Sequence, residues 1–361
     1  MGSAPASSAI FDAITRRALS DLDTFTSWLS QHGVRGYIGE VGWPDDAKGD
    51  AAPWNQLAQR WFQAADRARL WVTVWATGEW WGTGYALAPY EASSGGAVDT
   101  ADTQAPVIER HLGSTRALRG VNVAGGEFGA PQVESTSSFS SRNLGAYGTA
   151  YHYDGAATFR FLAGRGFRLV RIPFRWERIQ PRLGGPLSQS EVGRLKRVVS
   201  RAHAAGLRAI LDMHNFAGYF EDQGGQGVRR NLGDAGMLDA FANVWRRIGR
   251  SFRSVPGLLG FDLMNEPVDV TPVGHLSPEA VWRKASQAAV VAIRGTGDRR
   301  LVLVEGYDWA GAQVWTEQNP TPWIHDPAHN VRYEAHQYFD IDYSGTYSMT
   351  YEQENSALGS G

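Results

Sequence analysis

Residues 259–265 read Leu-Gly-Phe-Asp-Leu-Met-Asn, a short apolar run that is followed directly by Glu266 and Pro267. A helical hydrophobic pattern precedes this run over residues 235–252, and another follows it over 278–295. A short apolar run between two helical patterns is typical of one strand of a parallel sheet and its crossover helices. We therefore expect a buried strand whose polar end lies at its carboxyl terminus.

The same alternation extends along the whole chain of 361 residues. Further strands are expected at 36–41, 70–75, 119–124, 168–173, 208–214, 301–305 and 331–336. Further helices are expected at 9–31, 54–68, 105–111, 154–164 and 188–205. Eight βα units predict an α/β protein with one domain over residues 1–361, a (β/α)8 TIM barrel with its site at the carboxyl ends of the strands. A doubly wound open sheet is the alternative, but no glycine-rich phosphate turn with a convincing strand-turn-helix context was found.

The tail after Tyr338 is polar and acidic and ends in Gly359-Ser360-Gly361, which predicts a loop or partial disorder. The first residues, Met1 to Ser8, are small and polar and lack the charged start and apolar run of a signal peptide. We expect them to be an expression remnant, and we expect the natural protein to be secreted by means of a signal that is absent from this sequence.

The composition excludes several classes of function. Lys and Arg number 35 against 37 Asp and Glu, so the chain has no strong field for nucleic acid or an anionic membrane. The absence of cysteine excludes disulfides, thiol catalysis and thiolate metal sites, and no apolar stretch is long enough to span a bilayer. The 14 Trp weakly favour a carbohydrate ligand, because flat aromatic rings stack on sugar rings. We expect a monomer with a saccharide partner.

Asn265-Glu266-Pro267 places a carboxylic acid at the mouth of the predicted barrel, with an amide beside it. Glycoside hydrolysis uses one carboxyl group to protonate the leaving oxygen and a second to attack or to activate water. Three residues are candidates for the second carboxyl group, since Glu40, Glu127 and Glu305 each end or follow a predicted strand. Glycines on both sides of Glu40 and near Glu127 allow sharp turns that expose the carboxylate. The spacing alone does not choose between Glu40 and Glu127.

The chain resembles glycoside hydrolase family 5, which comprises retaining (β/α)8 enzymes that include cellulases and mannanases. The resemblance rests on seven short segments that are distributed over most of the chain: 119–122, 170–174, 211–215, 265–267, 336–338, 38–40 and 74–75. In the family, the strands with the Arg, the His and Asn-Glu-Pro come first, and those with the nucleophile and the Trp close the chain. In this chain the strands that carry the nucleophile and the Trp come first instead. The order implies a circular permutation, with residues 117–361 equivalent to the N-terminal part of the family barrel and 1–116 to its C-terminal part.

The resemblance implies a role for each matched residue. Glu40 is expected to be the nucleophile and Glu266 the acid/base, while Glu127 lies where the family has substrate-binding loops. Arg171 would keep the nucleophile ionised. Substrate hydroxyls or the catalytic carboxyls would be held by His214 and Asn265, His336 and Tyr338 would line the site, and Trp75 would be the sugar platform. Weaker candidates for outer sugar-binding positions are Trp80, Trp81 and Trp176.

The implied reaction is double displacement without cofactor or metal, with the two carboxyl groups about 5–5.5 Å apart. The matched segments look closest to endo-β-1,4-glucanases. A β-mannanase, a mixed-linkage β-glucanase and an exo-β-glycosidase of the same family remain open. Two alternatives come from other classes: a non-catalytic carbohydrate-binding barrel, and a metal-dependent hydrolase with Asp212, His214 and His336 as ligands.

Overall fold

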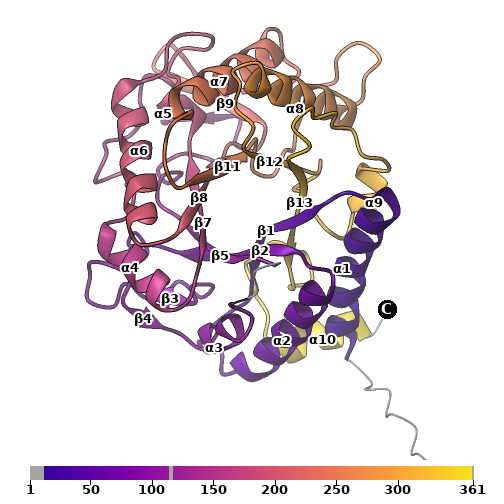
Figure 1. Cartoon of the computed structure of the whole chain (residues 1–361). Coiled ribbons are helices and arrows are strands. Elements are labelled where there is room, and N and C mark those ends of the chain that lie inside the picture. Colours follow the sequence, from indigo (N-terminus) through magenta and orange to yellow (C-terminus); the bar gives the residue numbers. More distant parts are fainter. Residues whose placement is uncertain (1–11, 114–116, 360–361) are drawn as a thin grey trace, which may run out of the picture.

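Eight parallel strands close into a barrel in the computed structural model, which describes residues 12–113 and 117–359 (Figure 1). Neighbours around the barrel follow the order β1-β13-β12-β11-β8-β7-β5-β2, so the first and last barrel strands pair with each other. The predicted (β/α)8 TIM barrel is therefore confirmed. The barrel strands are β1 Gly36–Gly42, β2 Trp71–Thr77, β5 Arg119–Val123, β7 Leu169–Phe174, β8 Arg208–Met213, β11 Leu258–Asp262, β12 Leu301–Glu305 and β13 Val331–Tyr338.

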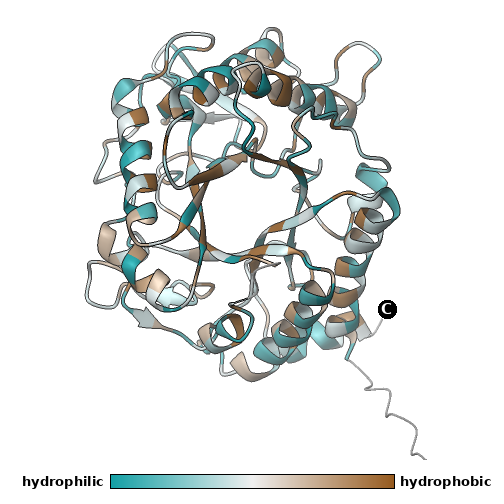
Figure 2. Ribbon diagram, in the orientation of Figure 1, coloured by the Kyte–Doolittle hydropathy of each residue, from teal (hydrophilic) through white to brown (hydrophobic). Residues whose placement is uncertain are grey.

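Helices surround the barrel and turn their apolar faces towards it (Figure 2). In α7, Phe241, Val244, Trp245 and Ile248 are buried at the three- and four-residue spacing of one helical face. Most of the predicted helices are present within three residues at either end, while residues 9–11 of the first lie outside the described residues. The helices are α1 Ala13–His32, α2 Ala51–Arg67, α3 Ala105–Glu109, α4 Ala156–Gly164, α5 Trp176–Ile179, α6 Gln189–Ala204, α7 Met237–Phe252, α8 Pro278–Arg294, α9 Trp315–Gln318 and α10 Tyr351–Gly359.

Small antiparallel sheets in the loops were not expected from the sequence. A two-stranded sheet joins β3 Tyr90–Glu91 to β4 Thr100–Ala101. A three-stranded sheet, to which β6 Thr136–Ser137 belongs, has the order β6-β10-β9. The hairpin of β9 (Gly218–Gln223) and β10 (Gln226–Asn231) turns through Gly224-Gly225, both in the left-handed region. A Gly-Gly pair between two polar strands is a recognised hairpin signal, although without an apolar face it is easily overlooked.

The polar tail is more ordered than its composition predicted. Residues 351–359 form α10, which packs against α1, and the predicted loop is therefore wrong for this segment. Buried side chains explain the helix: Tyr351 packs edge-on against Trp54, and Glu354 Oε2 accepts a hydrogen bond of 2.6 Å from the Ile341 nitrogen. Trp54 is distant from the tail in sequence, so the polar composition of the tail could not reveal this contact. Residues 360 and 361 lie outside the described residues.

Among the described residues, no helix is both long and apolar enough to cross a membrane.

Candidate active site

A cavity of about 760 Å³ opens at the carboxyl ends of the barrel strands. Six of the eight predicted site residues line it, and the other two, Arg171 and Asn265, are buried. The structure therefore gathers these predicted residues at one cavity at the carboxyl ends of the strands, the place where barrels of this type carry their sites. The six lining residues are Glu40, Trp75, His214, Glu266, His336 and Tyr338.

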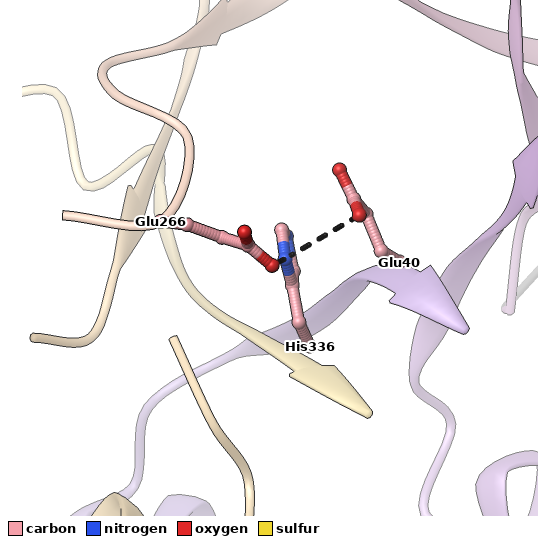
Figure 3. A group of neighbouring side chains, drawn as sticks. All are labelled: Glu40, Glu266 and His336. Atoms are coloured by element: carbon pink, nitrogen blue, oxygen red, sulfur yellow. Dashed lines mark hydrogen bonds and ion pairs between the residues drawn. The ribbon is translucent and has the colours of Figure 1, made fainter. Parts of the chain in front are cut away.

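Two carboxyl groups face each other in this cavity with one imidazole between them (Figure 3). Glu40 lies in β1, and Glu266 follows β11, three positions away around the barrel. One oxygen of each, together with a ring nitrogen of His336, lie within 4.8 Å of one another. His336 Nδ1 is 2.8 Å from Glu266 Oε1 and 3.8 Å from Glu40 Oε2. This spacing suits a retaining pair, for which about 5–5.5 Å separates the carboxyl groups.

Glu40 is held as a carboxylate. Arg171 Nη1 donates to its Oε1 at 3.0 Å, and the Tyr338 hydroxyl donates to its Oε2 at 2.7 Å. Burial would raise the pKa of Glu40, but attraction to His336 and then to Arg171 outweighs it and lowers that pKa below its usual value. An ionised carboxylate at neutral pH is the state that nucleophilic attack requires.

Glu266 has the opposite electrostatic character. Burial raises its pKa, and repulsion by Glu40 adds to this, while the hydrogen bond from His336 opposes both. Burial is the largest of these effects. Two carboxyl groups whose pKa values are pushed apart are suited to one nucleophilic and one acidic role. The backbone is left-handed at Glu266 (φ 45°), and its nitrogen donates to Glu305 Oε2 at 2.6 Å.

Below the cavity, Arg171 lies at the centre of a fully buried group of carboxyls. Its guanidinium contacts Glu40 and four acidic residues that the sequence did not place around it: Asp212, Asp262, Glu305 and Glu334. Burial raises the pKa of Asp262 to about 6, of Asp212 to about 7 and of Glu334 to about 8. The sequence did contain a signal for this group, namely acidic residues inside otherwise apolar strands. Acidic residues are almost never fully buried without a partner, so a buried cation could have been expected near them.

The glycines beside Glu40 serve a different purpose from the one predicted. Gly39 and Gly42 lie in the extended strand β1, not in a turn. A Cβ at Gly39 would lie 1.7 Å from Glu334 Oε1, and one at Gly42 would lie 2.8 Å from the Trp75 carbonyl oxygen. The prediction of a sharp turn was therefore wrong, and the glycines allow close packing around the carboxylate.

Trp75 and His214 form another part of the cavity lining, whereas Asn265, which precedes Glu266 in the chain, is fully buried. The Trp75 ring stacks on His214 with centroids 5.3 Å apart, and its Nε1 donates to the Tyr85 hydroxyl at 3.0 Å. Burial lowers the pKa of His214 well below its usual value, so the ring is neutral at pH 7. Asn265 Oδ1 accepts from Arg171 at 2.8 Å, whereas its buried Nδ2 has no hydrogen-bond partner among the described residues and can donate to a ligand.

Two other candidates lie elsewhere. Glu127 is buried away from the cavity lining, its Oε2 accepts from the Gly125 nitrogen at 2.8 Å, and burial raises its pKa to about 7. Trp176 is packed in the core against Tyr219 and Phe241, so its interpretation as an outer sugar-binding residue is wrong. For an apolar residue just after a strand end, the sequence does not distinguish a side chain that lines the cavity from one that is packed in the core.

Trp80 and Trp81 lie half-buried in the loop after β2, where both rings contact Phe128. The sequence did not identify four aromatic residues that line the cavity: Tyr85, Phe216, Trp309 and Tyr343. They lie in loops whose course depends on the assembled barrel. A run such as Asp308-Trp309-Ala310 carries no periodic signal.

Groups that could hold a cation occur at three places in the described residues. The predicted alternative set of Asp212, His214 and His336 is not among them. Asp212 pairs with Arg171 and His214, whereas His336 contacts the two cavity carboxyls. The three groups are Glu40–Glu266–His336, Glu79–His152–Asp154 and Glu305–Glu334–His336.

The sequence model of the cellulase family, glycosyl hydrolase family 5, matches residues 119–359, about two thirds of the chain. The chain belongs to glycosyl hydrolase family 5. Proteins similar to it include the manganese dependent endoglucanase Eg5A of Phanerodontia chrysosporium, 30% identical over 271 residues, which cover 72% of this chain and 64% of that protein. Endo-β-1,4-glucanase B of Emericella nidulans is 30% identical over 245 residues, which cover 67% of this chain and 65% of that protein.

Among solved structures of similar proteins, endoglucanase Cel5A of Pseudomonas stutzeri in complex with cellobiose is 38% identical, with a TM-score of 0.54. That match covers 64% of this chain and 62% of the other. The family 5 chain thus spans less than two thirds of the length of each of these three proteins.

Proposed function

We propose that the protein is a retaining endo-β-1,4-glucanase, with Glu40 as nucleophile and Glu266 as acid/base. The observation that carries the proposal is the pair of cavity carboxyls within 4.8 Å, one with a lowered and one with a raised pKa. Family membership supports the reaction class, and the endoglucanase names of the similar proteins support the substrate class.

The proposed reaction has two steps. Glu40 attacks the anomeric carbon while Glu266 gives its proton to the leaving oxygen, and a glycosyl ester forms on Glu40. Water then attacks the same carbon, Glu266 takes the proton of the water, and the Glu40 carboxylate is released. The free Nδ2 of Asn265 is available to the 2-hydroxyl, and the half-buried Trp75 ring to the sugar face.

The first experiment is reducing-sugar release from carboxymethylcellulose, mixed-linkage β-glucan and β-mannan by the wild type, Glu40→Gln and Glu266→Gln. We expect the wild type to cleave the β-1,4-glucan internally and both variants to lose at least about a thousandfold in rate, because each lacks a group that acts in the transition state. The same assay with a chelator, and then with added manganese, tests whether a cation takes part.

Each outcome has a definite meaning. Cleavage of mannan or of mixed-linkage glucan alone, or release only from chain ends, would replace the endo-β-1,4-glucanase with the corresponding family 5 activity. Binding without cleavage would identify a non-catalytic carbohydrate-binding barrel. Loss of activity with the chelator would contradict the metal-free mechanism.

We also propose that the chain is a circularly permuted family 5 barrel. The family match begins at β5, whereas β1 with Glu40 and β2 with Trp75 precede it and complete the barrel. Contact between the two ends of the described chain supports the proposal: the Ile14 nitrogen donates to Asn355 Oδ1 at 3.2 Å, and the Tyr351 hydroxyl donates to Asp12. In family order, β13 and α10 would continue directly into α1.

Reordering the chain tests the permutation. A variant that begins at residue 117, joins residue 361 to residue 1 and ends at residue 116 should fold into the same active barrel. We expect its free energy of unfolding to lie within about 1–2 kcal/mol of the original, because loop closure depends only weakly on loop length. Urea unfolding and the glucan assay measure both properties. A reordered chain that is insoluble or lacks cooperative unfolding would contradict the proposal.

We also propose that the protein is secreted, because a polymeric β-glucan substrate lies outside the cell. We propose that it acts as a monomer, because residues of a single chain form the whole proposed site.

A further inference from the structure

One histidine and two acidic residues form a cluster in the segments that follow β2 and β5, outside the cavity lining. Glu79 belongs to the loop after β2, and His152 and Asp154 belong to the segment between β5 and α4. One nitrogen or oxygen of each side chain lies within 4.8 Å of those of the other two. The reaction proposed above uses none of these three residues.

Hydrogen bonds hold the cluster in place. His152 Nε2 is 3.2 Å from Asp154 Oδ1, and the Glu79 nitrogen donates to Asp154 Oδ2 at 3.1 Å. Glu79 Oε1 accepts from the Gly155 nitrogen at 2.8 Å and from the Thr158 hydroxyl at 2.6 Å. Gly155 is the residue at which α4 begins, so the cluster ties the loop after β2 to the start of this helix.

The cluster has more carboxyl groups than cations. Neither Glu79 nor Asp154 forms an ion pair with a Lys or Arg among the described residues, and Arg201 donates to the Asp154 backbone carbonyl instead. The Asp154 side chain is fully buried, and burial raises its pKa to about 6. The hydrogen bond to Asp154 is the largest cause of the raised pKa of His152, and the charge of Glu127 adds to it. Glu127 is therefore close enough to act on the imidazole.

Glu127 has a buried oxygen that nothing in the described chain satisfies. Its Oε1 has no hydrogen-bond partner among the described residues, although the residue is only 8% exposed. Arg178 does not supply the partner, because it donates to the backbone carbonyls of Gly126 and Phe128. Buried polar atoms in folded proteins are nearly always hydrogen-bonded, and an exception points to a bound water or ion.

We propose that Glu79, His152 and Asp154 bind a divalent transition-metal ion of the zinc type, and that Glu127 accepts a hydrogen bond from water on this ion. Zinc takes imidazole nitrogen and carboxylate oxygen at about 2.0–2.2 Å, which places adjacent ligands of a tetrahedral ion about 3.3 Å apart. The His152–Asp154 distance of 3.2 Å is close to that value. Three protein ligands leave the fourth position for the water, and a hydrogen bond from it would satisfy Glu127 Oε1.

The ion holds a loop in place and takes no part in the reaction. Trp80, the neighbour of Glu79, contacts the His152 ring with centroids 5.4 Å apart. Trp81 follows and stacks on Tyr85, which lines the cavity, with centroids 4.0 Å apart. The ion therefore fixes the loop behind this part of the lining. The His152 side chain is 20% exposed, which gives the ion a path from solvent.

The test titrates zinc chloride into the wild type, His152→Ala and Asp154→Asn by isothermal titration calorimetry. The wild type should bind one more zinc ion than either variant, whatever the cavity group of Glu40, Glu266 and His336 binds in all three proteins. Glu127→Gln should keep this ion but weaken its binding about tenfold, as is typical when a group that orients a metal ligand is replaced. Calcium chloride should give no such difference, because calcium prefers a shell of oxygen ligands.

Stability gives a second readout. At a hundredfold excess of zinc over the dissociation constant, Tm should rise about 4 °C more in the wild type than in His152→Ala, since an ion that binds only the folded state stabilises it. His111→Ala is the matched control, because its imidazole also pairs with a carboxyl group, that of Asp66, but belongs to none of the three groups. It should bind as many zinc ions as the wild type.

Anomalous diffraction at the zinc absorption edge locates the ion directly, and urea unfolding without zinc shows whether each variant is folded. Zinc found only between Glu40 and Glu266, or equal zinc binding by the wild type and a folded Asp154→Asn, would overturn the site. The inference does not depend on the proposed function. A chelator should leave hydrolysis unchanged well below Tm, because the ion touches no reacting atom.

Discussion

Glu40→Ala is expected to lower turnover of an aryl β-cellobioside by about four to six powers of ten, in line with removal of a nucleophile in other enzymes. Sodium azide should restore part of the activity. The anion fits the space left by the carboxylate and attacks the anomeric carbon from that side. The product should therefore be the α-glycosyl azide, with inverted configuration. Nuclear magnetic resonance of the anomeric proton identifies it.

Glu266→Ala should respond to azide in the opposite stereochemical sense. With an activated aryl leaving group, Glu40 still forms the ester, and azide then attacks from the side of the missing acid/base. The second inversion gives the β-glycosyl azide. The configuration of the azide product therefore distinguishes the nucleophile from the acid/base, although replacement of either residue is expected to abolish hydrolysis.

Glu127→Ala is the control, because Glu127 was the other candidate for the nucleophile and is also buried. We expect no azide product from this variant. An α-azide from Glu127→Ala, or a β-azide from Glu40→Ala, would reverse the assignment made from the order of the strands.

The sequence predicted the strands that carry the site because their signals are local. Each barrel strand is an apolar run between helical patterns, and Asn265-Glu266-Pro267 marks a strand end without knowledge of its neighbours. The choice between Glu40 and Glu127 was not local, and only the resemblance to the family separated them. The structure adds a physical difference: Glu40 contacts Arg171 and Tyr338, whereas Glu127 binds its own loop.

Features that depend on distant partners could not be predicted. The buried face of α10 is defined by its contacts with α1 and α2, and the ring contact between Phe216 and Trp309 joins two loops about 90 residues apart in the chain. Glu334 looks like an ordinary strand residue until Gly39, which is 295 positions away, makes room for its carboxyl group. Hydrophobic periodicity and motif spacing do not predict long-range packing of this kind.

Arg171→Met is expected to cost about 3–5 kcal/mol of the free energy of unfolding at neutral pH, the typical loss when a buried charge loses its partner. Arg171 is fully buried and contacts five carboxyl groups, which would then repel one another in a dry environment. Arg119→Met is the matched control. Arg119 is also buried, but its acidic partner Asp66 is 37% exposed and can be solvated once the guanidinium is lost. Guanidinium chloride unfolding measures both losses.

The loss caused by Arg171→Met should grow with pH. The folded pKa values of Asp262, Asp212 and Glu334 are about 6, 7 and 8, all above their unfolded values of about 4. The stability that such groups contribute is present at low pH and is lost as pH rises through the folded pKa. Attraction to Arg171 lowers all three pKa values, so the variant should bind more protons in its folded state and lose stability faster on the alkaline side. The difference in the free energy of unfolding between the variant and the wild type should be smallest near pH 5 and largest near pH 8.

A difference that stays constant over this range would mean that Arg171 acts through packing and hydrogen bonds, and that the carboxyl groups around it do not titrate.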